Sequence, residues 1–302
     1  MTIPPTPTAL SPAQPAAEGA TILSGVNVLI QGDGGVGKTH CLGTFVMWNP
    51  KIDCHYFAFE SGFESLAGFF LDPPPRGLGM SSLPPNLHIT TVKPPTASWN
   101  DLAENTKYIN TMSYSALKKM GDPNRSKYDQ FEKFLRTFND VTSDDGRKWG
   151  ALDKWGPNKA VFIDGLTGLG RSAMQAVVGG KIDRDQPDFG LAQGLIEEFL
   201  RRITDASCKC HFVLLTHIER EIDEVNGGSK ITVSVPGKKL SGKIPPMFSD
   251  VILAKRVGKE FWWDTEDPNA VTKTRNLPIE SKIKPDFKII LDSWQRRGGV
   301  VP

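Results

Sequence analysis

The chain has 302 residues, of which 39% are hydrophobic and 23% charged, with a formal net charge of +2. This composition is ordinary for a soluble globular protein, and so small a net charge does not by itself indicate a nucleic-acid partner. No apolar run reaches the roughly 18 residues of a membrane-spanning helix, so we expect no membrane partner. Four scattered cysteines exclude a disulfide scaffold and indicate a reducing, cytoplasmic location.

The first twenty residues, MTIPPTPTALSPAQPAAEGA, lack the basic start and apolar stretch of a signal peptide. Their proline, alanine and threonine content cannot build a packed core, which predicts a disordered tail at 1–20. Residues 21–302 are expected to form a single domain.

Strands and helices are predicted to alternate from residue 25 onward. Apolar runs indicate strands at 26–30, 55–59, 87–92, 160–163 and 211–215. Helical spacing indicates helices at 39–48, 99–110, 128–138 and 189–206, the last burying Leu191, Leu195, Phe199 and Ile203. The alternation predicts an α/β fold with a mostly parallel sheet, helices on both faces, and ligands at the carboxyl ends of the strands. A polar insert at 121–157 and a basic, hairpin-rich region at 218–302 depart from this pattern.

The segment after the first strand matches G-x-x-x-x-G-K-[ST] in full. Its glycines let main-chain N–H groups face phosphate oxygens, and the next helix offers its positive end to the same anion. Lys38 is expected to reach the β- and γ-phosphates and Thr39 to bind Mg²⁺. The residues expected to contact the nucleotide are Gly32, Asp33, Gly34, Gly35, Val36, Gly37, Lys38, Thr39 and His40. The alternative is a glycine-rich turn with a solvated lysine.

Acidic residues end two of the predicted strands. Asp164 follows the run VFI and is expected to be the second Mg²⁺ ligand, although it could instead cap the next helix. Many P-loop ATPases carry a water-activating Glu directly after this Asp, but here the position is Gly165. The general base must then come from elsewhere, and Glu60 is the candidate, with Glu64 in reserve. A surface carboxylate at a helix start is the other interpretation of Glu60.

The fifth strand ends at Thr216 and His217, where polar groups could sense the γ-phosphate; a packed histidine is the alternative. Just before this strand, Cys208 and Cys210 have C-x-C spacing. No second Cys or His pair completes a metal site, so ordinary thiols are expected.

The nucleotide base is inferred from what the sequence lacks. Ras-like GTPases need an Asn-Lys-x-Asp and a D-x-x-G, and neither is present around Asn158, Thr272 or Asp164, which disfavours GTP. ParA-type ATPases carry a second lysine where this chain has Asp33.

The order GDGGVGKT, YFAFE, LHITTV, VFID and FVLLTH resembles the RecA-like core. In particular it is similar to the phage-encoded P-loop nucleotide-binding proteins, which include RecA-like single-strand-annealing ATPases, over residues 23–291. The resemblance implies a homo-oligomeric, Mg²⁺-dependent ATPase of the host cytoplasm. It implies that Thr39 and Asp164 bind Mg²⁺, Glu60 is the base and His217 reads the γ-phosphate. It also implies that Lys273 and Arg275 enter a neighbouring subunit's nucleotide site, although a surface basic patch would look the same.

A basic cluster precedes two tryptophans in the C-terminal third. Its members, against the single acid Asp250, are Lys230, Lys238, Lys239, Lys243, Lys255, Arg256 and Lys259. The cluster could bind along the backbone of single-stranded DNA, although a solvated charged face is the alternative. Trp262 and Trp263 could stack on bases, although core packing is the alternative for at least one of them.

These features predict an ATPase acting on single-stranded DNA in phage-type recombination or annealing, with a single-strand-binding protein as a further partner. An ATP-switched binding module with slow hydrolysis and a protein partner is the rival expectation. A small-molecule kinase would need an arginine-rich lid, of which the sequence carries no clear mark.

Overall fold

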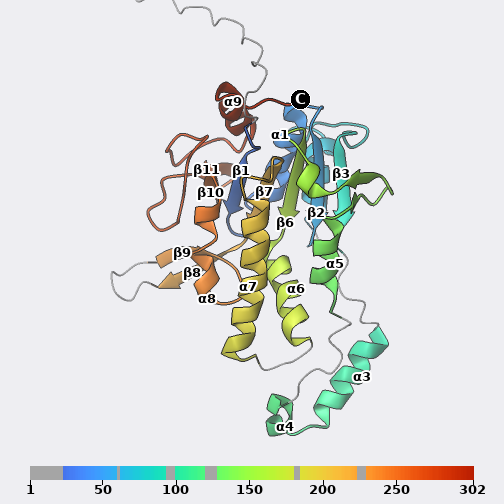
Figure 1. Cartoon of the computed structure of the whole chain (residues 1–302). Coiled ribbons are helices and arrows are strands. Elements are labelled where there is room, and N and C mark those ends of the chain that lie inside the picture. Colours follow the sequence, from blue (N-terminus) through green and yellow to red (C-terminus); the bar gives the residue numbers. More distant parts are fainter. Residues whose placement is uncertain (1–22, 60–61, 93–98, 120–127, 180–183, 223–228) are drawn as a thin grey trace, which may run out of the picture.

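The computed structural model describes residues 23–59, 62–92, 99–119, 128–179, 184–222 and 229–302, so the predicted tail at 1–20 lies outside it. Its central sheet has seven strands in the order β11-β10-β1-β7-β6-β2-β3 (Figure 1). Their bounds are Asn27–Gln31 (β1), Asp53–Ala58 (β2), Leu87–Thr91 (β3), Lys159–Asp164 (β6), His211–Thr216 (β7), Asp250–Val257 (β10) and Glu260–Asp264 (β11).

All neighbouring strands of this sheet run parallel except β10 and β11. The parallel strands are buried runs of β-branched and aromatic residues, as expected when both faces of a sheet are covered. Strand β1 lies between β7 and β10, with Leu29 opposite both Leu214 and Val251. The predicted fold class, an α/β core with a mostly parallel sheet, is confirmed.

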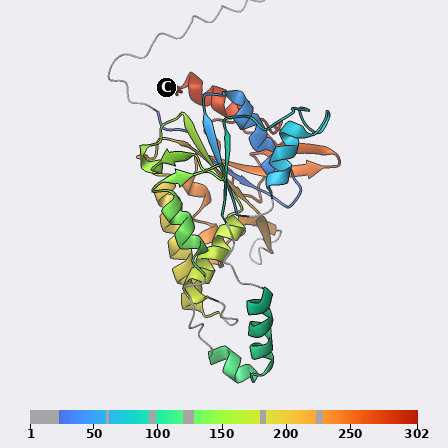
Figure 2. The same cartoon turned by 90° about the vertical axis from the view of Figure 1, so that its right-hand side faces the viewer.

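Two hydrophobic clusters separate the helices into two layers. Helices α1 (Lys38–Trp48), α2 (Phe63–Leu71) and α9 (Lys288–Arg296) bury their apolar side chains against one face of the sheet. Helices α5 (Gln130–Thr137), α6 (Leu166–Val178) and α7 (Gln186–Ile203) cover the other face. Figure 2 shows the two groups on opposite sides of the strands.

The described part of the insert at 121–157 belongs to the core, although its sequence is polar on average. Phe131 and Phe134 of α5 are buried, and the Phe134 ring packs edge-on against Phe57 and Phe199. Strands β4 (Val141–Thr142) and β5 (Lys148–Gly150) form a small antiparallel hairpin, followed by a 3-10 turn, η2 (Leu152–Lys154).

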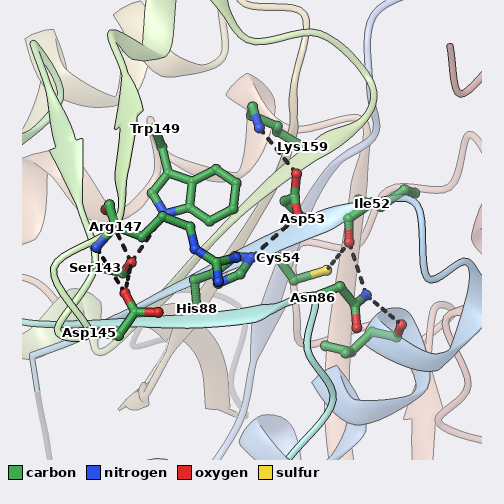
Figure 3. A network of polar contacts seen from close by, with 11 residues as sticks. Ile52, Asp53, Cys54, Asn86, His88, Ser143, Asp145, Arg147, Trp149 and Lys159 are labelled. Carbon is green, nitrogen blue, oxygen red and sulfur yellow. Dashed lines mark hydrogen bonds and ion pairs between the residues drawn. The ribbon is translucent and has the colours of Figure 1, made fainter.

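A polar network joins this hairpin to the edge of the sheet (Figure 3). Asp53 accepts a hydrogen bond from Lys159 at 3.2 Å and lies 3.3 Å from His88 Nε2. Lys159 Nζ also lies 4.6 Å from the centre of the Trp149 ring, a cation–π distance. Trp149 in turn donates its indole N–H to Ser143 at 3.1 Å. The insert is therefore fixed to β2, β3 and β6 by both apolar and polar contacts.

Two further helices, α3 (Trp99–Asn110) and α4 (Tyr114–Lys119), lie apart from the sheet in both views (Figures 1 and 2). Trp99 is 87% exposed on α3. In the part of the chain that the structure describes, no helix combines the length and apolarity needed to cross a membrane.

Helix α7 begins at Gln186, three residues before the predicted start. Asp185 and Asp188 form a reciprocal capping box there, and Pro187 occupies the first turn, where its missing N–H costs nothing. The buried face is also rotated from the predicted one. Leu191 is 62% exposed, whereas the buried residues are Ala192, Ile196, Phe199, Leu200 and Ile203.

The C-terminal third is rich in hairpins, as predicted, but it also completes the sheet. Strands β8 (Ile218–Ile222) and β9 (Ser229–Val233) form a separate antiparallel pair, followed by the short helix α8 (Lys238–Ser241). Strand β10 then enters the central sheet beside β1, and α9 packs on its face.

Candidate functional site

The glycine-rich loop connects the carboxyl end of β1 to the start of α1. Gly35 and Gly37 have φ values of 72° and 82°, in the left-handed region that favours glycine. Lys38 is 8% exposed, and its Nζ donates to the carbonyl oxygens of Gly32 at 2.9 Å and Asp33 at 2.6 Å. The lysine is thus held at the mouth of the loop, where its motif places it.

The hydroxyl of Thr39 and the carboxylate of Asp164 meet beside this loop. Thr39 Oγ1 donates to Asp164 Oδ2 at 2.8 Å, although the two residues are 125 positions apart. Tyr56 donates its hydroxyl to the same oxygen at 2.6 Å. Asp164 is 7% exposed, and none of the described residues forms an ion pair with it. A buried carboxylate whose partners are hydroxyls, beside a phosphate-binding loop, fits a site for a hard cation such as Mg²⁺.

Gly165 explains why no acidic residue follows Asp164. Its φ of 109° lies in the left-handed region at the start of α6, where a Glu side chain would be strained. The position after Asp164 therefore supplies no second carboxylate.

The predicted base, Glu60, lies outside the described residues. The residues on either side of it are close to Asp164: Phe59 N–H donates to the Asp164 carbonyl at 3.3 Å. A Cβ on Gly62 would lie 2.4 Å from Asp164 Oδ2, so the chain passes too close to this carboxylate for a larger residue. The reserve candidate, Glu64, is exposed in the first turn of α2.

The carboxyl end of β7, where the phosphate sensor is predicted, adjoins the loop; the sensing role stays a prediction. Gly32 N–H donates to the Thr216 carbonyl at 3.1 Å. His217 follows Thr216 directly, and its carbonyl accepts the Ser234 N–H at 2.9 Å. His40, predicted to contact the nucleotide, turns toward α2: its Nδ1 lies 3.2 Å from the Ser65 carbonyl and its ring packs on Phe69.

Arg220 of β8 forms a bidentate ion pair with Asp33. The two guanidinium nitrogens lie 3.0 and 2.6 Å from the carboxylate oxygens, and both side chains are about half exposed. The Arg220 hydrogen bond is the main reason that the pKa of Asp33 lies below its usual value.

Lys273 and Arg275 lie at the other end of β1 within the same subunit. Both line a pocket together with Gly25 and Asn27, residues at the amino-terminal side of β1. Lys273 Nζ donates to the Pro246 carbonyl at 3.2 Å, and the Arg275 main-chain N–H donates to Asp250. The intramolecular geometry therefore does not bring either cation to the loop, and a role in a neighbouring subunit stays a prediction.

The basic cluster divides into paired and unpaired members. Lys255 contacts Asp264 and Asp267 at 2.7 and 2.5 Å, and Lys243 contacts Glu197 at 2.8 Å, so these lysines are already neutralised. Lys238 lies 3.6 Å from Glu221, and the Arg256 guanidinium lies over the Phe261 ring. Three lysines of the cluster are exposed and form no ion pair with any described residue: Lys230, Lys239 and Lys259.

The two tryptophans do not both face solvent. Trp263 is 1% exposed and packs against Phe287 in the core, and Trp262 is partly buried. The neighbouring Phe261 is 40% exposed and lies beside the loop, since a Cβ on Gly37 would come 3.2 Å from its ring.

Cys208 and Cys210 are both buried, and their sulfur atoms are 3.5 Å apart. Among the described residues, no group of three or more His, Cys, Asp or Glu side chains could hold a metal ion.

Sequence reasoning missed three residues of the site: Tyr56, Arg220 and Phe261. None belongs to a motif. Tyr56 is three residues before the predicted strand end at Phe59 and Arg220 is three residues after the predicted sensor His217, so their proximity to strand ends was the only available signal.

No family model matches the chain, and no curated protein matches it. Among solved structures, the flagellar accessory protein FlaH from Methanocaldococcus jannaschii aligns with 80% of this chain and 77% of its own. The sequence identity is 10% and the TM-score 0.32. The ATPase EscN of the enteropathogenic E. coli type III secretion system, solved with its central stalk EscO, aligns with 88% of this chain and 55% of its own. Here the identity is 14% and the TM-score 0.38.

Likenesses at this level carry no argument about function. The assignment of the fold rests instead on the parallel sheet, the glycine-rich loop and the Thr39–Asp164 contact. The core is an α/β P-loop fold.

Proposed function

We propose that this protein is a Mg²⁺-dependent ATPase with a RecA-like core that acts on single-stranded DNA in phage-type recombination or annealing. The observation that carries the proposal is the 2.8 Å contact between Thr39 and Asp164 beside a complete phosphate-binding loop. A loop hydroxyl and a strand-end carboxylate are the two protein ligands that P-loop NTPases offer to Mg²⁺. Bound Mg²⁺ would neutralise charge on the β- and γ-phosphates.

Each residue of the loop has a defined task in this proposal. Lys38 exchanges its two carbonyl partners for phosphate oxygens, while main-chain N–H groups of the loop bind the same anion. In hydrolysis the water oxygen forms a bond to the γ-phosphorus, and the bond from that phosphorus to the β–γ bridging oxygen breaks. ADP leaves with the electron pair of the broken bond, and the water proton passes to the general base.

Glu60 is the proposed base. The support is its place in the sequence, directly after Phe59 just beyond β2, which pairs with the strand that carries Asp164. Glu64 is the reserve candidate because α2 starts immediately after this segment.

Single-stranded DNA is the proposed polymeric partner. Lys230, Lys239 and Lys259 are exposed and form no ion pair with any described residue, and Lys259 lies in the turn after the carboxyl end of β10. Cations at the same sheet edge as the nucleotide would link phosphate-backbone binding to the state of the γ-phosphate. We further propose a homo-oligomer in which Lys273 and Arg275 reach a neighbouring nucleotide site, with a single-strand-binding protein as an additional partner.

A second candidate is an ATP-switched binding module with a protein partner. Helices α3 and α4 favour it, because they extend from the core and expose Trp99 and Tyr114 at 87% and 74%. Gly165 is also compatible with slow hydrolysis, because it stands where many P-loop ATPases have the Glu that activates water.

The test is the ATPase rate of the full chain with and without single-stranded DNA. We expect strong stimulation by single strands and little by duplex DNA. Lys38→Ala should abolish turnover, whereas Lys51→Ala, which removes an exposed lysine of the α1–β2 turn, should not. Glu60→Gln should keep nucleotide binding but slow hydrolysis by about 10²–10⁴-fold.

Two results would contradict the proposal at different points. Turnover that ignores DNA favours the binding module. Normal hydrolysis by Glu60→Gln with slow hydrolysis by Glu64→Gln moves the base to Glu64.

A further inference from the structure

Asp33 of the phosphate-binding loop is held by two cations from different elements. Lys38 Nζ donates to its main-chain carbonyl at 2.6 Å, and Arg220 contacts both oxygens of its side chain at 3.0 and 2.6 Å. Lys38 is the residue expected to move onto the phosphates. Arg220 and Lys38 thus contact the same loop residue, Arg220 through the Asp33 side chain and Lys38 through the Asp33 main chain.

The Asp33–Arg220 pair is accessible to a ligand. Their side chains are 50% and 53% exposed, so a phosphate group can approach the guanidinium without displacing core residues. Arg220 belongs to β8, which begins directly after the predicted sensor His217, and the Ser234 N–H donates to the His217 carbonyl at 2.9 Å. The hairpin that carries Arg220 is thus fixed next to the loop.

A carboxylate in a phosphate-binding loop needs a cation. With ATP bound, Asp33 would face several negative charges at short range, and repulsion between them would weaken binding. Arg220 neutralises Asp33 in the nucleotide-free chain, and its planar fork of donors suits a phosphate as well as a carboxylate. The γ-phosphate carries more charge than one carboxylate, so it competes well for the guanidinium.

We propose that Arg220 is a further catalytic residue of this site: when ATP binds, its guanidinium keeps one contact with Asp33 and turns its other donors to the γ-phosphate oxygens, so that it bridges the two anions. The inference rests on the proposed function, since it requires ATP in the loop. Arg220 then stabilises the charge that develops on the γ-phosphoryl group, from within the same subunit, while Lys38 contacts the β–γ side.

The alternative is that Arg220 only neutralises Asp33 and never touches the nucleotide. A double-mutant cycle separates the two roles. Affinities for ADP and for a non-hydrolysable ATP analogue are measured by calorimetry on wild type, Arg220→Ala, Asp33→Ala and the double variant. Arg136→Ala, which breaks an exposed ion pair with Glu132, is the matched control.

Contact with the γ-phosphate predicts an effect that depends on that phosphate. Arg220→Ala should lower the affinity for the ATP analogue about 10-fold or more, but the affinity for ADP by less than about 2-fold. It should also lower the ATPase rate by about 10²-fold or more. The loss should persist in the Asp33→Ala background. Arg220→Lys should recover part of it, because the charge remains while the fork is lost. Arg136→Ala should match wild type in every measurement.

The inference is overturned if Arg220→Ala lowers the affinities for ADP and for the ATP analogue equally, or if the double variant binds the ATP analogue as tightly as wild type. Either outcome leaves the proposed ATPase function intact. Wild type that binds ATP but ignores DNA removes only the DNA part of the proposed function, and wild type that binds no adenine nucleotide overturns both proposals.

Discussion

The hydroxyl of Tyr56 lies 2.6 Å from Asp164 Oδ2, and the Tyr56 side chain is otherwise fully buried. A hydrogen bond from a buried donor orients a carboxylate for its metal, so its loss should weaken the site without removing a ligand. Tyr56→Phe should therefore raise the Mg²⁺ concentration needed for ATP binding by about 10-fold. The measurement is ATP affinity as a function of Mg²⁺, with Tyr108→Phe, an exposed tyrosine of α3, as the control. Equal Mg²⁺ dependence in the two variants would show that Tyr56 does not orient Asp164.

Among single residues of the candidate site, the sequence predicted those that belong to one local motif or end one apolar strand. Lys38 and Thr39 are fixed by the loop, and Asp164 by the end of an apolar strand. Tyr56 and Arg220 are 108 and 187 positions from their partners, so only the strand order brings them into contact. Nothing local to either residue marks that contact.

Helix α5 is the element through which the insert joins the core. Phe134 is 1% exposed and packs against four aromatic rings: Phe57, Phe59, Phe138 and Phe199. Phe134→Ala should lower the free energy of unfolding by about 3–5 kcal/mol, because it opens a cavity in this cluster. Chemical denaturation measures the change. Leu135→Ala, one residue along on the exposed side of α5, should cost far less, and similar costs for the two would mean that the insert is only loosely attached.

The ends and buried faces of helices and strands were harder to predict than whether a segment is a helix or a strand. The predicted helix at 189–206 exists as Gln186–Ile203, displaced at its start because the Asp185–Asp188 capping box and Pro187 extend it backward. Its exposed Leu191 looked like part of the buried stripe. Strand β10 lies within the region predicted to be rich in hairpins, and it does form one with β11. Its second partner, β1, could not be read from nearby residues.

The whole molecule should lose stability as the pH falls below about 6.5, the ordinary histidine pKa. Burial lowers the pKa of His55 to about 2, with smaller contributions from His88 and Lys159, and burial lowers that of His211 to about 4. The unfolded chain therefore takes up protons first, and stability present at neutral pH is lost on acidification. The slope is at most about 1.4 kcal/mol per pH unit for each histidine.

Unfolding free energies at pH 7.5, 6.0 and 5.0 test this. His55 has no hydrogen-bond partner for either ring nitrogen within the described chain, and its ring packs against Trp149 and Trp155, so His55→Phe should fold. Burial also lowers the pKa of His88, so the substitution should reduce the slope by about a third to a half. The contribution of His211 to the slope should remain, because its Nδ1 accepts the Val26 N–H and a protonated ring cannot accept that hydrogen bond. A carboxyl with a lowered pKa, such as Asp267, adds its loss only below about pH 4. An unchanged slope in His55→Phe would assign the proton uptake to other groups.

The position of β1 between β7 and β10 has a consequence for biosynthesis. This strand, at 27–31, is translated well before both of its neighbours, which lie at 211–216 and 250–257. Until then its apolar backbone edge is open to unintended pairing, and closing such long chain separations is slow. The nascent chain should therefore depend on chaperones more than its modest length suggests, and stop codons upstream of β10 should yield aggregated fragments instead of a smaller nucleotide-binding unit.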